Sequence, residues 1–369
     1  MKRLNIYYSA FFIKVIMFDQ YSFISIISLA IVVIVFVIKK QKPHIKNMLI
    51  CAVLSVLIPT KYADIIKYSA ISDTEILNGY VKSKAKEKVQ CEHYQEVCTT
   101  TNNVKTCQKY YDHKFDIDWT VRTTAGTLYI NRIDQQGLKE PRRFREVVIN
   151  EPASIENHYK NYLLANEDSL FSHYSSALKR FGKYLPSYPK VYDYYRINRV
   201  LYADDEFKSI ALDWNEKLNN TLKKLGRKKQ VNLIVVLTQQ PPEFFYALQA
   251  KWKGGKKNDV ILVYGVENQR VKWFSSTSFL DGYLNNDMHS KLRVTSLEQP
   301  LNNHVLDKAI SIIDEDFIRY EMSNEEAQKE AFRMPWYHLL LALLLGQLPS
   351  IIMLLHFHLI VIPTRSSRV

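Results

Sequence analysis

Three cysteines and two histidines lie close together in one stretch of the chain, and their side chains could bind a metal ion. They are Cys91, His93, Cys98, Cys107 and His113. Thiolate sulfur and imidazole nitrogen are ligands that zinc prefers, so this set offers enough ligands for a Zn²⁺ ion. The spacings differ from the compact C-x-x-C pairs of zinc modules. A disulfide between two of the cysteines, with one thiol left over, is the favoured interpretation, and the spacing leaves the pairing open.

Carboxylates form the second group of candidates for chemistry. A metal-assisted hydrolase would need carboxylates that meet at the carboxyl ends of parallel strands. Asp281 suits that edge, whereas Asp259 begins a predicted strand and is expected at the opposite end. Asp116 and Asp118 alternate with apolar residues, so both are expected on the solvent face of a half-buried strand.

The common catalytic motifs are missing from the sequence. It has no P-loop, no G-x-S-x-G motif and no H-E-x-x-H motif. The most frequent classes of nucleotide hydrolase, serine hydrolase and metalloprotease are therefore excluded.

The elements that would position the carboxylates centre on residues 231–264. An apolar, β-branched run at 231–238 predicts a buried strand, and a pair of prolines that starts at Pro241 ends it and begins a helix. A pair of glycines that starts at Gly254 ends this helix just before a second apolar run at 259–264. This order predicts one βαβ unit, with two parallel strands and a helix packed over one face.

Further elements flank the βαβ unit. Asp204 is predicted to cap an amphipathic helix, whose apolar residues recur at three- and four-residue steps and which Gly226 ends. A turn at Asn268 leads to an alternating third strand at 270–275. A last amphipathic helix is expected at 304–320.

The preceding region predicts a small β-rich module. Its expected strands lie at 79–90, 115–122, 127–133 and 144–149. A polar helical pattern follows at 156–178. The stretch at 184–189 is rich in tyrosine and proline, which predicts an extended linker.

Several short motifs occur in the order strand, crossover helix, strand, third strand. They are Val-Asn-Leu-Ile-Val-Val-Leu at 231–237, Tyr246-Ala247, Trp252, Asn-Asp-Val-Ile-Leu-Val at 258–263 and Arg-Val-Lys-Trp at 270–273. In this order, residues 203–320, about a third of the chain, resemble the TPM-domain family. The resemblance implies an α/β sandwich on a membrane-anchored, extracytoplasmic protein.

The same resemblance implies an activity. Acid phosphatase activity is attributed to some TPM-domain proteins, with acidic residues and a divalent ion near the strand ends, and Asp259, Asp281 and Asp287 would be those residues here. Two positions depart from the family's pattern. The family usually has glycine where Asp259 stands, and a glycine-rich stretch containing Thr-Gly where this chain has Ser-Ser-Thr-Ser-Phe at 275–279.

The hydrophobic residues, 47% of the chain, are concentrated in a few segments. The segments at 21–38, 45–65 and 336–362 are long and apolar enough to predict about three transmembrane helices. A signal peptide is the competing interpretation of the first segment, but no small-residue cleavage site follows it. Residues 1–20 form a leader, and Met17 offers an alternative start.

Basic residues predict the orientation of these helices. The formal net charge is +13. Lysines crowd the link between the first two helices and arginines follow the last, which predicts that both flanks are cytoplasmic. They are Lys39, Lys40, Lys42, Lys46, Arg365 and Arg368. Three basic residues near the start favour the opposite orientation but are more widely spaced; they are Lys2, Arg3 and Lys14.

Together these features predict a multi-pass protein of the cell membrane. A basic cytoplasmic loop falls within 21–70, and a β-rich module with its linker at 71–200 and a TPM-like α/β domain at 203–333 lie outside the cytoplasm, in the periplasm of a Gram-negative cell.

Non-enzymatic binding or assembly of a membrane complex is the favoured function, with membrane lipid and a membrane protein as partners. The alternative is a metal-assisted phosphatase or hydrolase that uses acidic residues near Asp281 and a divalent cation. A channel would require several copies, because only about three membrane helices are predicted and they hold few polar residues. Nucleic acid is not expected as a partner, because no motif for it accompanies the positive charge.

Overall fold

The computed structural model describes residues 45–101, 104–161, 175–279, 284–320 and 334–361, together with the single positions 27, 30, 33, 34 and 37. The chain divides into two compact units. The helix unit comprises Met1–Ser72, Asn161–Asn166 and Glu325–Val369, and the sheet unit comprises Asp73–Lys160 and Glu167–Asn324.

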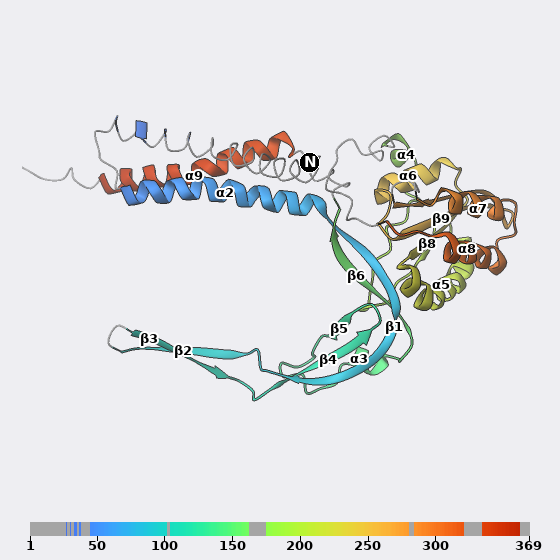
Figure 1. Ribbon diagram of the computed structural model, residues 1–369, viewed down its shortest axis with the longest axis horizontal. Helices are drawn as coiled ribbons and strands as arrows, with labels where there is room; N and C mark the ends of the chain where they lie inside the picture. Colours follow the sequence, from blue (N-terminus) through green and yellow to red (C-terminus); the bar gives the residue numbers. More distant parts are fainter. Residues whose placement is uncertain are drawn as a thin grey trace, which may run out of the picture. The chain divides into compact units, whose positions relative to one another are not determined.

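Two long helices, α2 (Ile45–Ile71) and α9 (Trp336–Val361), lie side by side in the helix unit (Figure 1). Cys51 Sγ lies 3.3 Å from Ser350 Oγ, and Tyr62 Oη lies 2.6 Å from His338 Nδ1. Because the earlier residue of α2 meets the later residue of α9, the two helices run antiparallel.

Both helices are long and apolar enough to cross a membrane, by length and composition. Helix α2 has 27 residues, and at about 1.5 Å per residue it is longer than the hydrocarbon core of a bilayer. The two later predicted membrane segments are thus helical. The first predicted membrane helix, at 21–38, lies outside the described residues apart from five single positions.

The sheet unit contains a four-stranded sheet in the order β10-β9-β8-β7. Its strands are β7 (Val200–Tyr202), β8 (Asn232–Thr238), β9 (Asp259–Glu267) and β10 (Arg270–Ser278). Strands β7, β8 and β9 are parallel, and β10 returns antiparallel to β9. The predicted βαβ unit and third strand are therefore confirmed. Asn268 and Gln269 form the turn between β9 and β10 with positive φ angles.

Helices cover both faces of this sheet, which explains why β8 and β9 are apolar without a break. Leu233, Val235 and Leu237 pack with one group of helices, and Ile234 and Val236 pack with the other. The first group is α5 (Lys208–Lys229), α7 (Asn286–Ser296) and α8 (Asn303–Asp316). The second is α6 (Glu243–Trp252) and α4 (Ser175–Phe181). The mixed α/β architecture agrees with the sequence.

A second four-stranded sheet has the order β5-β4-β1-β6. Its strands are β1 (Ser72–Val89), β4 (Asp116–Thr123), β5 (Thr127–Ile130) and β6 (Pro152–Lys160). A separate two-stranded sheet, here called the hairpin, consists of β2 (Tyr94–Thr101) and β3 (Val104–Tyr111). The predicted β-rich module is present, although the sequence did not indicate the hairpin.

Two elements of this region differ from the predictions. The expected strand at 144–149 is wrong, because a short helix, α3 (Arg142–Glu146), places Phe144 against Trp119 with ring centroids 4.8 Å apart. The start of the helix expected at 156–178 is also wrong, because the residues up to Lys160 belong to strand β6. Strand β6 is at the sheet edge and buries few side chains, so its sequence shows little alternation.

The ends of helix α5 also differ from the predictions. Asp204 does not cap it: a short 3-10 helix, η2 (Asp205–Phe207), intervenes, and the Asp204 carboxylate accepts a hydrogen bond from the Gln239 N–H at 2.8 Å. Gly226 does not end it, because the helix runs to Lys229. A Cβ at Gly226 would lie 2.5 Å from Cβ of Asn78, so this glycine allows α5 to approach strand β1 closely.

A buried arginine joins the two larger sheets. Arg199 is 1% exposed, and its guanidinium donates to Asn219 at 2.7 Å, to Asn78 at 2.5 Å and to Ser154 at 2.6 Å. It also donates to Asn232. Burial lowers the pKa of Arg199 to about 9, which leaves the group charged at neutral pH. These bonds connect β1 and β6 with the α/β sheet.

Candidate functional site

Asp259 is the first residue of strand β9, and its carboxylate is fully buried. It accepts hydrogen bonds from Asn232 Nδ2 at 2.8 Å, Tyr188 Oη at 2.8 Å and the Lys256 N–H at 2.7 Å. Burial raises the pKa of Asp259 to about 6, against the lowering effect of these donors. Both carboxylate oxygens are thus engaged with neighbouring parts of the fold.

Of the other two carboxylates of the hydrolase hypothesis, the structure describes only Asp287. Asp281 is outside the described residues, and Asp287 is an exposed residue in the first turn of α7. Because β10 is antiparallel, its last residue, Ser278, pairs with Val260. The segment that follows β10 therefore begins at the amino-terminal edge of the parallel strands. A site of the expected kind would lie at the opposite, carboxyl-terminal edge.

A serine–histidine cluster that the sequence did not indicate joins α7 to the end of β10. His289 Nδ1 lies 2.7 Å from Ser276 Oγ, and His289 Nε2 lies 3.0 Å from Ser278 Oγ. Burial lowers the pKa of His289 to about 4, so the ring is neutral at pH 7. Among the described residues, no carboxylate hydrogen-bonds to this ring, so the cluster lacks the acid that orients the histidine of a catalytic triad.

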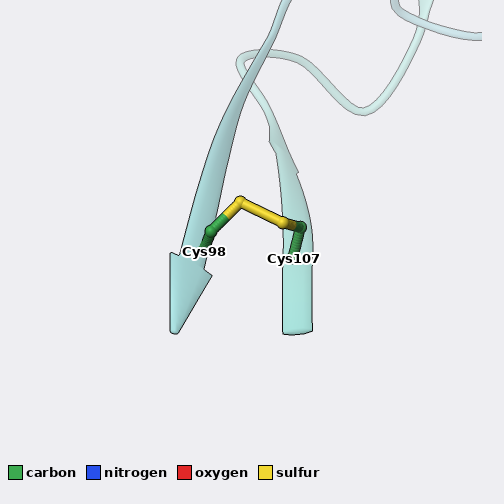
Figure 2. The surroundings of a disulfide bond; sticks show 2 residues. All are labelled: Cys98 and Cys107. Atoms are coloured by element: carbon green, nitrogen blue, oxygen red, sulfur yellow. A yellow bond between two sulfur atoms is a disulfide. The ribbon is translucent and has the colours of Figure 1, made fainter. Parts of the chain in front are cut away.

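The hairpin contains the disulfide that the sequence predicted without a pairing. Cys98 and Cys107 face each other across β2 and β3 and are bonded (Figure 2). The bond removes both cysteines from the candidate set of metal ligands. Cys91 is the thiol left over in this region, and it is buried.

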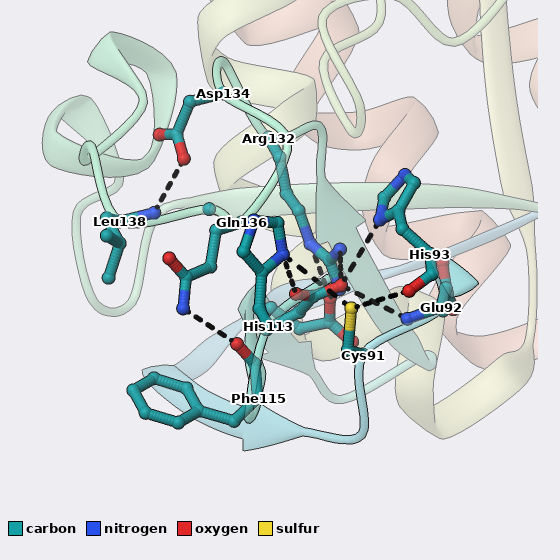
Figure 3. A network of polar contacts seen from close by, with 12 residues as sticks. Cys91, Glu92, His93, His113, Phe115, Arg132, Asp134, Gln136 and Leu138 are labelled. Carbon is teal, nitrogen blue, oxygen red and sulfur yellow. Dashed lines mark hydrogen bonds and ion pairs between the residues drawn. The ribbon is translucent and has the colours of Figure 1, made fainter. Parts of the chain in front are cut away.

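Cys91, His93 and His113, the other three candidate ligands, come together with Asp116 at the base of the hairpin (Figure 3). One ligand atom from each of the four residues lies within 4.8 Å of every other. Cys91 Sγ is 3.6 Å from His113 Nδ1, which is 3.2 Å from Asp116 Oδ1. His93 Nδ1 is 3.6 Å from Asp116 Oδ2.

The hydrogen-bond geometry of this cluster argues against a cysteine–histidine–aspartate triad. In a triad, one ring nitrogen of the histidine faces the nucleophile and the other faces the carboxylate. Here the same atom, His113 Nδ1, faces both Cys91 and Asp116. Several electron-rich atoms that converge on one point are instead typical of ligands around a cation.

Asp116 is buried, so its predicted position on the solvent face is wrong. The cause is Arg132, which lies 2.9 Å from Asp116 Oδ2 and 2.6 Å from Asp118 Oδ1 and thereby pairs with both carboxylates. Burial acts to raise the pKa of Asp116, but hydrogen bonds from the Glu92 N–H and the Cys91 thiol, together with the charge of Arg132, lower it below its usual range. The carboxylate is therefore ionised at neutral pH.

Comparison of the chain with protein-family models, with curated proteins and with solved structures finds no match.

Proposed function

We propose that this chain is an integral membrane protein that presents a non-enzymatic binding module outside the cytoplasm. The antiparallel pairing of α2 and α9 supports the proposal, because it fits two membrane spans with everything between them on one side. The segments before α2 and after α9 carry basic residues, which favours a cytoplasmic location for both segments. A disulfide in the intervening region fits an oxidising compartment.

The exposed hairpin is the observation that carries the binding role. Every described side chain from Tyr94 to Thr100 and from Lys105 to Tyr111 is exposed. Four of them are large hydrophobic or aromatic residues, the kind that contributes most to protein interfaces; they are Tyr94, Val97, Tyr110 and Tyr111. A hairpin that is covered by nothing in the described chain offers these side chains to a partner protein.

The TPM-like assignment of residues 203–320 is part of this proposal, and the enzymatic role implied by the resemblance is its alternative. A hydrolase at Asp281 would need a second carboxylate nearby. Asp259 is already held by three donors, and Asp287 lies on the surface of α7. These contacts favour binding over catalysis.

Site-specific photo-crosslinking in native membranes tests the binding role. We expect a photoreactive amino acid at Val97, on the hairpin, to give a discrete adduct with a membrane protein. The same amino acid at Leu212, an exposed position on α5, is the matched control and should give none. The adduct at Val97 should be lost in Tyr110→Ala, which removes a neighbouring aromatic contact.

A hydrolase assay of the full chain tests the alternative function. Metal-dependent cleavage of a generic phosphate ester that disappears in Asp281→Asn, together with no adduct at Val97, would overturn the proposal in favour of a hydrolase.

A further inference from the structure

We propose that Cys91, His93, His113 and Asp116 bind a zinc ion that holds together the base of the hairpin. The inference does not depend on what the hairpin binds or on which side of a membrane it lies. It rests on the identity of the four ligands, on their spacing and on their positions in the chain.

The donor set is typical of zinc. One thiolate, two imidazoles and one carboxylate supply sulfur, nitrogen and oxygen, all of which zinc accepts, whereas calcium and magnesium require oxygen ligands. Four ligands from the protein complete a tetrahedral shell, which is characteristic of structural zinc sites and leaves no open position for a substrate.

The distances between the donors fit such a shell. With usual zinc–ligand distances, a tetrahedral site separates sulfur from nitrogen by about 3.6 Å and nitrogen from oxygen by about 3.3 Å. Cys91 Sγ and His113 Nδ1 are 3.6 Å apart, and His113 Nδ1 and Asp116 Oδ1 are 3.2 Å apart. These two pairs of ligand atoms thus already lie at the spacing of a tetrahedral site, and all four ligand atoms lie within 4.8 Å of one another.

His93 provides a second, independent indication. Its Nδ1 atom is buried and has no hydrogen-bond partner among the described residues; Asp116 Oδ2, 3.6 Å away, would form an ion pair with it only if the ring were protonated. A buried ring nitrogen without a partner is costly unless another group satisfies it. A zinc ion that accepts the lone pair of this nitrogen would satisfy it.

Outer contacts hold the ligands in place. Arg132 donates to Asp116 Oδ2 at 2.9 Å, and the Glu92 N–H donates to the same oxygen at 3.2 Å. Second-shell hydrogen bonds of this kind orient the ligands of known metal sites. The side chains of His93 and His113 remain partly exposed, which leaves a path for the ion to enter.

The positions of the ligands explain what the ion would do. Cys91 and His93 immediately precede β2, His113 follows β3, and Asp116 begins β4. A backbone hydrogen bond from the Asp112 N–H to the His93 carbonyl, at 3.0 Å, closes the same point. Zinc would therefore join the strands that enter and leave the hairpin, and binding would release the proton of the Cys91 thiol to water.

Metal analysis of the full chain in detergent micelles tests the site. After removal of metal with a chelator, addition of zinc and desalting, we expect about one zinc per chain. Cobalt added in place of zinc should give the thiolate-to-metal charge-transfer band and the intense visible bands of a tetrahedral sulfur-containing site. Both signals should be lost in Cys91→Ser and strongly reduced in His113→Ala.

Two control variants separate this site from other thiols. Cys51→Ala removes the free thiol of α2, and the double variant Cys98→Ala/Cys107→Ala removes the disulfide. Both should still bind zinc, because all four ligands lie outside β2 and β3, the strands that the disulfide joins. If the wild-type chain keeps no zinc and its cobalt spectrum is that of an octahedral ion, the proposal is wrong, whatever the variants do. Full zinc content in Cys91→Ser would also overturn it.

Discussion

Asp259 shows how burial and hydrogen bonding compete at a single carboxylate. Burial raises its pKa to about 6 even though Asn232, Tyr188 and the Lys256 N–H all donate to it. In the unfolded chain the group returns to the usual pKa of about 4. Between these two values the folded state holds a proton that the unfolded state has lost, so the stability that this residue contributes falls as the pH rises.

Replacing Asp259 with asparagine should remove this pH dependence. We expect the unfolding free energy of the wild type, relative to Asp259→Asn, to fall between about pH 4 and pH 6 at up to about 1.4 kcal/mol per pH unit. Urea unfolding of the full chain in detergent, followed by tryptophan fluorescence, measures the difference. Asp287→Asn, which changes an exposed carboxylate, should leave the wild-type profile unaltered. A pH-independent difference for Asp259→Asn would contradict the assigned pKa.

Asp116 shows what a local sequence pattern cannot reveal. Its alternation with apolar residues predicted a solvated side chain, yet the carboxylate is buried because Arg132, 16 residues later, neutralises it. The local pattern contains no information about a partner such as Arg132, which belongs to another segment. The same holds for the cluster as a whole, since Cys91 and His113 were candidates but Asp116 could be added to them only from the structure.

Among the elements, the hairpin depends most clearly on a covalent bond. An isolated two-stranded sheet is marginally stable, and the side chains of this one are exposed on both faces. Cys98 and Cys107 close a short loop with a sequence separation of 9, which removes about 2–3 kcal/mol of conformational freedom from the open form. The disulfide is therefore expected to decide whether the hairpin stays ordered.

Removal of the disulfide should open the hairpin and leave the rest of the fold intact. In Cys98→Ala/Cys107→Ala we expect amide hydrogen exchange to become fast in β2 and β3 while β8 and β9 keep wild-type protection. Cys51→Ala, which alters a cysteine outside the hairpin, is the control. Unchanged protection in the double variant would show that other contacts hold the hairpin.

The predictability of each element follows from how local its signals are. The βαβ unit was predictable because prolines, glycines and unbroken apolar runs mark its boundaries within the sequence itself. The hairpin was not, because strands that are exposed on both faces lack hydrophobic alternation. Helix α3 was missed since it buries one side chain, Phe144, which gives no helical period. Gly226 was misjudged because its partner, Asn78, lies far away in the sequence.

At the scale of the whole molecule, the proposed topology makes one prediction about location. A cysteine at Tyr129, which is exposed in the sheet unit, should react with a membrane-impermeant maleimide in intact cells. A cysteine at Gln41, in the basic stretch before α2, should react only after the cells are permeabilised. Both changes are made in a chain without Cys51 and Cys91. If only the Gln41→Cys chain were labelled in intact cells, the orientation would be the reverse of the proposed one.

The contacts between β1 and the α/β sheet limit how the protein can be divided. Asn258 Nδ2 donates to the Ile76 carbonyl at 2.8 Å, Asn78 Nδ2 donates to the Val231 carbonyl at 2.9 Å, and Lys257 lies 3.1 Å from Glu75. Without β1, the Val231 carbonyl would lose its bond from Asn78, Asn258 Nδ2 would keep only its bond to the Gln230 carbonyl, and Lys257 would lose its ion pair, with a cost of about 1–3 kcal/mol for a buried group left unsatisfied. The α/β region consequently cannot be transferred alone. A gene fusion or recombination that moved it to another protein would also have to include β1, which is encoded far upstream.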